Sequence, residues 1–331
     1  MRRLFRCSLI SALTVVGSVI GAGFITGKEI CEFFGKDFSL SGVYLAFICF
    51  SFTIYFLMSF KGGFLIDKII GVFVSIANVV ISACMISALE KVFFSLFGNL
   101  ENIKIFTILS TILLFIISLN GVGAIEKFNS VFTPLIIVVV IILSLYKTQD
   151  YSSPVSPQSL LGTFNPIIYV GFNVVLSSGV IKNGGEKLSP PSKIISSILT
   201  SLILCALIYL ISCATKSTKS SEMPFVNLFI ENEKLLIIVD IITLFAIFTT
   251  LASSFYTSVD FGGIKIPFAC KIVIFLSCLC IAKIGFSSIV EILYPLIGAF
   301  GYAVVLVTFL LSKLSLKEQR ERTLSRQGHI G

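Results

Sequence analysis

Four hydroxyl groups gather near the end of the apolar stretch LFAIFTTLASSFY. Thr249 and Thr250 are adjacent, and Ser253 and Ser254 follow one helical turn later. A small hard cation prefers several oxygen ligands, and hydroxyls can supply them beside backbone carbonyls that a broken helix leaves free. Hydroxyls inside apolar helices also commonly bond back to the carbonyl four residues earlier. From these residues alone, both interpretations stay open.

Carboxylates also occur inside apolar stretches, where a charge is costly and is a functional hypothesis by default. Glu29 is the most informative, because it follows a glycine-rich segment by about two helical turns. There it could line an outer vestibule, gate that vestibule with Lys28 or a neighbouring helix, or carry a proton. We therefore expect a gating or coupling role for Glu29. The other acidic residues of this kind are Glu32, Glu90, Asp240 and Glu291.

The sequence lacks the groups for most enzyme chemistry. Its single histidine, His329, lies in the C-terminal tail, so no histidine-based triad or zinc site is expected. The nine cysteines lie mostly within apolar stretches and show neither metal-ligand spacing nor a disulfide pattern, which favours a role in packing. We expect no enzyme and no cofactor, apart from Na⁺ as a coupling ion.

The elements that carry these residues are apolar runs of membrane-spanning length. Of the 331 residues, 56% are hydrophobic and 13% are charged, against about a quarter charged in soluble domains. Runs of about 18 residues or more can cross the hydrocarbon core of a bilayer. We predict an all-α polytopic membrane protein in a single domain with ten spans. They are 7–34, 39–60, 69–97, 104–119, 128–146, 160–181, 192–214, 235–258, 267–284 and 288–312.

The charges between the spans predict the orientation, because Lys and Arg are retained on the cytoplasmic side. The side with both termini carries more than twice as many of these residues as the other side. Both termini are therefore expected in the cytoplasm, with residues 313–331 as a basic tail. This bias explains the net charge of +8 without a nucleic-acid partner. The basic N-terminus resembles a secretory signal peptide, but we expect it to remain as part of the first span.

Two of the ten spans carry residues that interrupt a helix. In lipid, a broken helix is tolerated only where protein, water or a ligand satisfies its backbone groups. The first span contains GSVIGAGF, with Gly21 and Gly23, and the sixth contains NPIIYVGFNVVLSSG, with Pro166, Gly171 and Asn173. Both spans are therefore predicted to be discontinuous.

Spans one and six hold matching positions if the chain consists of two five-helix units of opposite topology. Such units would cover roughly 7–146 and 160–312, with a binding site between them near the bilayer midplane. Two other interpretations of the first span remain. Gly17 and Gly21 have the spacing of closely packed membrane helices. A nucleotide-binding loop is disfavoured, because no strand precedes Gly21 and the third glycine, Gly27, comes one residue late.

Four blocks of sequence together resemble the YkvI-type bacterial membrane proteins, a group within the amino acid, polyamine and organocation transporter superfamily. The blocks are GSVIGAGFITGKEICEFF, IIYVGFNVV, FAIFTT and GFSSIVEILYPLIG. The resemblance runs over nearly the whole chain. It implies the LeuT-like fold of five-plus-five inverted repeats, with helices one and six discontinuous at the substrate site, and alternating access. It also implies the cytoplasmic (inner) membrane of a bacterium.

The sodium-coupled carriers of this superfamily suggest roles for individual residues. A cation would meet carbonyls and hydroxyls from spans one and eight, namely those of Gly17, Ile20, Ala246, Thr249 and Thr250. A substrate carboxylate would meet the backbone N–H groups of Ala22 and Gly23 beside Gly21. The facing wall would come from span six, with Tyr169, Gly171 and Asn173. A second sodium site is doubtful, because Phe24 stands where a polar ligand is expected.

The leading functional hypothesis is a secondary active transporter that imports an amino acid or similar small zwitterion with a cation. The Thr249 and Thr250 pair favours Na⁺ over H⁺ as that cation. The alternative is a nutrient sensor or receptor subunit that keeps the carrier fold and its ligand pocket but transports nothing. A channel has little support, because no ring of charges or filter-like repeat is visible. We expect a monomer or a weak homo-oligomer.

Overall fold

The computed structural model describes residues 2–35, 40–60, 64–98, 102–148, 164–218, 221–260 and 266–327, and these residues contain helices and no strand. The long helices follow the predicted spans. They are α1 (Arg2–Val19), α4 (Leu40–Ser59), α5 (Phe64–Phe97), α6 (Ile103–Leu119), α7 (Val122–Thr148), α8 (Asn165–Gly185), α9 (Pro190–Ala214), α11 (Glu233–Val259), α12 (Phe268–Ile281) and α14 (Tyr294–Gln327).

Short helices complete the bundle. They are α2 (Ala22–Ile25), α3 (Lys28–Phe34), α10 (Pro224–Asn227) and α13 (Phe286–Ser288), with two single 3₁₀ turns, Thr215–Ser217 and Ala282–Ile284, and a π-helical turn, η4 (Ile289–Leu293). The first span thus contains α1, α2 and α3, and the tenth contains α13, η4 and α14.

The surface of the bundle is that of a membrane protein. Among the described residues, seven helices are long and apolar enough to cross a bilayer by length and composition, and Leu4–Val19 and Ile103–Leu119 are shorter apolar helices. Large apolar side chains such as Tyr44, Leu113 and Val131 are about 60–70% exposed, which suits lipid but not water. The prediction of a polytopic helical membrane protein is confirmed.

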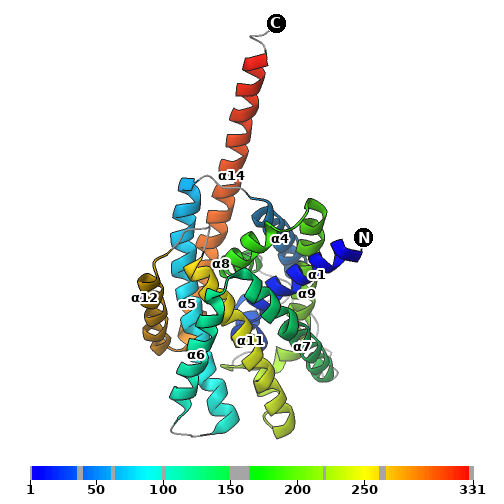
Figure 1. Ribbon diagram of the computed structural model, residues 1–331. Helices are drawn as coiled ribbons and strands as arrows, with labels where there is room; N and C mark the ends of the chain where they lie inside the picture. The colour runs from blue at the N-terminus through cyan, green and yellow to red at the C-terminus, as the bar shows by residue number, and fades with distance from the viewer. Residues whose placement is uncertain are drawn as a thin grey trace.

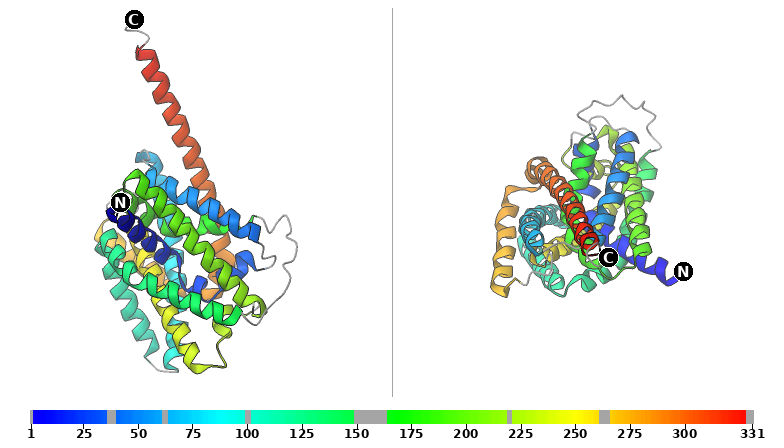
Figure 2. Two further views of the ribbon diagram at one scale, coloured as in Figure 1. Left: turned by 90° about the vertical axis from the view of Figure 1, so that its right-hand side faces the viewer. Right: turned by 90° about the horizontal axis from the view of Figure 1, so that it is seen from above.

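The contacts between the long helices, labelled in Figure 1, match between the two halves of the chain. Helix α1 packs on α7 as α8 packs on α14, α4 packs on α8 as α9 packs on α1, and α6 packs on α11 as α12 packs on α5. The two counterparts α5 and α11 pack extensively on each other at the centre. This is the predicted five-plus-five arrangement. Helix α14 continues well beyond the bundle, as Figure 2 shows from two further directions.

The predicted interruption of the first span is confirmed. Helix α1 ends at Val19 and α2 begins at Ala22, so Ile20 and Gly21 lie between two helices. A second interruption follows at Gly27, which has a φ of +76° between α2 and α3. Glycine reaches this left-handed conformation without the steric cost that a side chain would add. The first span is therefore three helical pieces.

The predicted interruption of the sixth span is wrong, because α8 runs without a break from Asn165 to Gly185. Pro166 lies in the first helical turn, where its missing N–H removes no bond. Asn173 donates from Nδ2 to the Tyr169 carbonyl at 2.9 Å within its own helix. Gly171 faces α14, where a Cβ would overlap the Gly298 carbonyl oxygen. Each residue that suggested a break instead supports a continuous, closely packed helix.

The tenth span is irregular, which the sequence analysis did not predict. Gly285 has a φ of +98°, and the π-helical turn η4 follows before α14 begins. Pro295 gives a physical reason, because it has no N–H to bond the Glu291 carbonyl four residues earlier and its ring crowds that turn. In this irregular part, η4 contacts α3, and Glu291 accepts a hydrogen bond from Lys28 of α3.

Candidate functional site

The break in the first span changes the hydrogen bonds of its backbone. The Gly21 N–H donates to the Val19 carbonyl at 2.9 Å instead of to the Gly17 carbonyl, the acceptor that a regular helix would use. The Gly21 backbone is extended, with a φ of −99° and a ψ of −167°. The Gly17 carbonyl therefore turns to another partner.

That partner comes from α11. The Thr250 Oγ1 hydroxyl donates to the Gly17 carbonyl at 3.4 Å, across the interface between α1 and α11. A Cβ on Gly21 would lie 3.2 Å from the same hydroxyl oxygen. Thr249 differs, because its hydroxyl bonds back to the Ala246 carbonyl at 2.9 Å within α11. Thr249 therefore makes the bond within its own helix that is common for hydroxyls, whereas Thr250 bonds to another helix.

The five residues predicted to hold a cation are all buried. Thr250 bonds to Gly17 across the α1–α11 interface, Thr249 bonds to Ala246 within α11, and Ile20 lies at the break between α1 and α2. Hydroxyl and carbonyl oxygens suit Na⁺, a hard monovalent cation, without a carboxylate. The described residues contain no group of three His, Cys, Asp or Glu side chains suited to another metal ion.

Helix α7 adds polar groups that the sequence analysis missed. Asn129 donates from Nδ2 to the Thr14 carbonyl at 2.9 Å and to Ser253 Oγ at 3.4 Å. Thr133 Oγ1 lies where a Cβ on Gly17 would be, and neither this oxygen nor Asn129 Oδ1 has a hydrogen-bond partner among the described residues. The segment NSVFT in an otherwise apolar span was the available signal. Gly17 and Gly21 are also close-packed, as the packing interpretation predicts.

Glu29 points into the bundle and not toward Lys28. Its side chain is 2% exposed, and its carboxyl group covers Gly23, where a Cβ would lie 2.6 Å from the Glu29 carboxyl carbon. Lys28 instead forms an ion pair with Glu291 of η4 at 2.6 Å. Glu29 Oε2 has no hydrogen-bond partner among the described residues. The broken span therefore holds a buried carboxyl group directly against its glycines.

Two phenols and a thiol lie in the same buried region as this carboxyl group. Tyr169 of α8, Tyr294 of α14 and Cys84 of α5 are completely buried and close enough to Glu29 for electrostatic interaction. The Tyr169 hydroxyl lies beside Asn173 and the Tyr294 hydroxyl beside Cys84, but neither hydroxyl forms a hydrogen bond of good geometry with a described residue. Sequence analysis identified Tyr169 but neither Tyr294 nor Cys84. Polar groups from four separate elements thus converge on the broken first span.

Aromatic rings enclose the two tyrosines. The Tyr169 ring lies 5.3 Å from Phe33, 5.3 Å from Phe34 and 6.3 Å from Phe50, measured between ring centroids. The Tyr294 ring stacks on Phe172 at 4.0 Å. These contacts fix both rings in a dry environment.

Ion pairs cover the same end of the bundle. Besides Lys28 and Glu291, Lys91 of α5 pairs with Glu222, which also accepts a hydrogen bond from Ser287 at 2.6 Å. The hydrogen bonds from Lys91 and Ser287 lower the pKa of Glu222 below its usual value. In the break between α2 and α3, the Thr26 carbonyl accepts from the Phe225 N–H of α10 at 2.8 Å. The end of the bundle beyond Glu29 is therefore closed in this conformation.

The remaining residues predicted for the substrate lie in different places. Gly21, Ala22 and Gly23 lie at the break, and Tyr169 faces the same region. Gly171 faces α14, so the structure does not bring it to the break, whereas Asn173 bonds within α8 and lies beside the Tyr169 hydroxyl.

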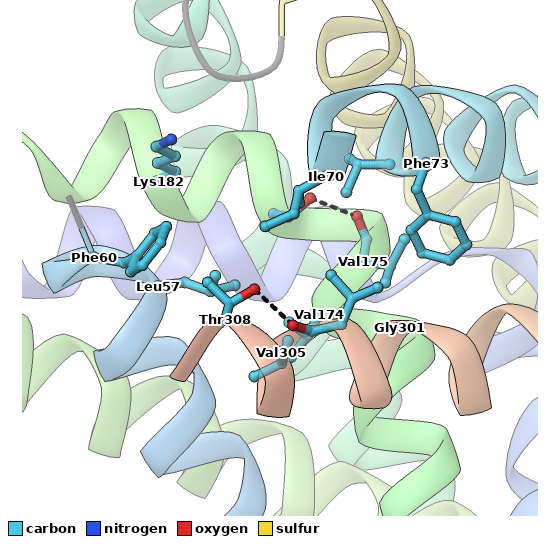
Figure 3. A pocket seen from close by; sticks show the side chains of 13 residues that line it. Leu57, Phe60, Ile70, Phe73, Val174, Val175, Lys182, Gly301, Val305 and Thr308 are labelled. Atoms are coloured by element: carbon cyan, nitrogen blue, oxygen red, sulfur yellow. Dashed lines mark hydrogen bonds between the residues drawn. The ribbon is translucent and has the colours of Figure 1, made fainter. Parts of the chain in front are cut away.

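An apolar cavity lies elsewhere, between α4, α5, α8 and α14. It measures about 30 Å³ and is lined by side chains such as Leu57, Phe73, Val174 and Val305 (Figure 3). Its lining contains none of the residues predicted to bind substrate or cation. The Lys182 side chain points away from Thr308 in Figure 3. We therefore do not assign the substrate to this cavity.

Known proteins resemble this chain in structure but not in sequence. No protein-family model and no curated protein sequence matches the chain. Among solved structures, it is similar to Mhp1, a nucleobase-cation-symport-1 family transporter solved in a closed conformation with bromovinylhydantoin bound. The TM-score is 0.56 at 13% identity, over 90% of this chain and 74% of that one. It is also similar to a manganese transporter from Eremococcus coleocola, with a TM-score of 0.53 at 12% identity, over 93% of this chain and 77% of that one.

The chain has a LeuT-like fold. Both similar structures are transporters of this fold and cover nearly all of the chain, in agreement with the mirrored packing of its two five-helix units. At these identities the likeness concerns the fold alone. The YkvI-type resemblance stays a prediction.

Proposed function

We propose that this protein is a secondary active transporter for an amino acid or similar small zwitterion, driven by Na⁺ and working by alternating access. The observation that carries the proposal is the broken first span with Thr250 bonded across it to the Gly17 carbonyl. In lipid, an interrupted helix is retained where its backbone groups meet a ligand or other protein groups. The H⁺ gradient is the alternative driving force.

The coupling ion would be held by the carbonyls of Gly17, Ile20 and Ala246 and by the hydroxyls of Thr249 and Thr250. Support comes from the donor set itself, which is neutral, oxygen-only and buried. Bound Na⁺ would accept electron density from these oxygens, while the two hydroxyls turn away from the carbonyls to which they now donate. Because the ligands come from both α1 and α11, the ion would favour the conformation in which these two helices are in contact.

The substrate would lie against Gly21, Ala22 and Gly23, with Tyr169 of α8 on the facing side. Support comes from unpartnered buried groups at this place, the Glu29 Oε2 oxygen and the Tyr169 hydroxyl. Such groups are costly to bury without a partner, so a polar ligand that satisfies them gains this free energy. We further propose the bacterial cytoplasmic membrane as the location, with both termini in the cytoplasm.

Counterflow and uptake of labelled amino acids in proteoliposomes, under separate Na⁺ and H⁺ gradients, test this proposal. The double variant Thr249→Ala, Thr250→Ala is expected to lose the dependence of uptake on Na⁺. Thr243→Ala is the matched control, because Thr243 is equally buried on α11 and its hydroxyl bonds only within that helix. Unchanged Na⁺-driven uptake in the double variant would contradict the assigned cation site. Ligand binding without counterflow in the wild type would favour a sensor over a transporter.

A further inference from the structure

We infer that Glu29 is the counter-ion for the substrate's ammonium group, so that this site selects primary amines. The inference rests on the proposed function and names the part of the substrate that the broken first span recognises. It follows from the position of one buried carboxyl group, from the partners that its charged neighbours already have, and from the continuity of α8.

Glu29 lacks an opposite charge among the described residues. Two lysines at the same end of the bundle have partners of their own, because Lys28 pairs with Glu291 and Lys91 pairs with Glu222. The Glu29 side chain is 2% exposed, and no ion pair to it occurs within 4 Å in the described part of the chain. Burying a carboxylate without a counter-charge costs several kcal/mol. A cationic ligand group would offset this cost through its attraction to the carboxylate.

The groups around Glu29 match the hydrogen-bonding capacity of an ammonium group. A primary ammonium has three N–H donors and no acceptor. Glu29 Oε2 and the hydroxyls of Tyr169 and Tyr294 are three buried oxygens, from α3, α8 and α14, that form no hydrogen bond of good geometry with a described residue. The stacked rings of Phe172 and Tyr294 add aromatic surface, which also favours a cation. This combination of one carboxylate, two phenols and aromatic faces suits an amine better than an anion.

Because α8 is continuous, its backbone carbonyls are not free to accept hydrogen bonds from an amine. An unwound sixth span would leave carbonyls free for the ammonium group. In this chain the α8 carbonyls are in helical bonds, and three of them also accept from side chains. Asn173 donates to the Tyr169 carbonyl at 2.9 Å, Ser177 to the Asn173 carbonyl at 2.6 Å, and Asn78 and Ser178 to the Val175 carbonyl at 3.1 and 2.8 Å. Glu29 takes the place of these missing acceptors.

The same carboxylate argues against a ligand that carries only a negative charge. The Glu29 carboxyl group lies directly over Gly23, so a substrate carboxylate placed at Gly23 would be within a few ångströms of it. Like charges at about 5 Å repel by roughly 3 kcal/mol at an effective dielectric constant of 20. In a zwitterion, the ammonium group would stand between the two carboxylates and remove this repulsion. The free amine is therefore the essential group.

Matched ligands and a charge-neutral variant test the inference. Purified full-length protein is screened by thermal shift and calorimetry against the standard amino acids and simple primary amines. Each amino acid that binds is compared with its amide, which keeps the ammonium group, and its N-acetyl derivative, which loses it. Glu29→Gln is nearly isosteric and removes the charge, while Glu29→Asp keeps it. Glu32→Gln, one turn later on α3, is the control for a general change in charge.

The amide is expected to bind and the N-acetyl compound is not. Glu29→Gln should weaken binding of the amino acid and its amide about tenfold or more, as for the loss of a charge-assisted hydrogen bond, and Glu32→Gln should change it less than about twofold. Glu29→Asp should keep the preference for the amide over the N-acetyl compound, which shows that any loss in Glu29→Gln is not misfolding. The inference is overturned if N-acetyl compounds bind as well as amino acids, if Glu29→Gln binds as tightly as wild type, or if no amine binds.

These results are separable from the proposed function. Amine binding that depends on Glu29, without counterflow, would uphold the inference and overturn transport. Counterflow of an amino acid that is unaffected by Glu29→Gln would uphold transport and overturn the inference.

Discussion

The first and sixth spans occupy equivalent places in the two five-helix units, yet one is broken and the other is continuous. In the first, Gly21 adopts an extended backbone between α1 and α2, and Gly23 leaves room for the Glu29 carboxyl group. In the sixth, Gly171 leaves room for the backbone carbonyl of Gly298 in α14. At both of these positions, the glycine lets another group approach closely. It does not say whether that group is a ligand-binding side chain or a packed helix.

The polar residues near the glycines decide between the two outcomes. In α8, Asn173 and Ser177 bond to carbonyls of the same helix, which adds to its own hydrogen bonds. In the first span, the Gly17 carbonyl instead accepts from Thr250 of α11, a residue of another span. The carbonyl that the break frees is thus satisfied by Thr250 and is not left an orphan.

Gly171→Ala is expected to give the largest change in stability. Its Cβ would overlap the Gly298 carbonyl oxygen and lie 2.9 Å from the Tyr302 Cβ, and a backbone carbonyl cannot move aside without shifting α14. Overpacking of this kind costs about 1–3 kcal/mol or more, measured as a lower melting temperature in detergent. Gly184→Ala is the control in the same helix, because its nearest neighbour is 3.7 Å away at the Glu126 carboxylate. Equal melting temperatures for the two variants would contradict the close α8–α14 contact.

Gly23→Ala tests the corresponding close approach in the broken first span. Here the new Cβ overlaps the end of a side chain, the Glu29 carboxyl group, which can rotate away. We expect a smaller fall in melting temperature than for Gly171→Ala but a loss of substrate binding of about tenfold or more, because Glu29 leaves its position. Gly123→Ala, on α7 with nothing within 4 Å of its Cβ, controls for added helix propensity. If Gly23→Ala binds substrate as tightly as the wild type, the position of Glu29 does not matter for substrate recognition.

The sequence alone predicted the fold class and the break in the first span. Both depend on local features, namely long apolar runs and the glycines within the first of them. It also placed Thr250 near Gly17, since the resemblance ties these positions together. It failed for α8, because Pro166 and Gly171 carry the same signal whether they break a helix or pack it. It also missed Tyr294 and Asn129, whose roles depend on which face of a helix meets the first span. Side-chain facing is a tertiary property that one sequence does not determine.

The smallest expected effect compares the ion pairs at the ends of the two spans. Lys28 of α3 and Glu291 lie 2.6 Å apart with 13% and 50% of their side chains exposed, whereas Lys187 after α8 and Glu126 lie 3.4 Å apart with 55% and 26% exposed. Double-mutant cycles with alanine, measured by reversible unfolding in mixed micelles, should give a coupling of about 0.5–1 kcal/mol for the first pair and near zero for the second, because water screens the more exposed lysine. If alternating access opens the closed end beyond Glu29, breaking the Lys28 pair should also speed ligand association, because this ion pair connects α3 to η4.

Equal coupling energies for both pairs, with unchanged association rates, would show that the broken span is held at its end no more firmly than the continuous one.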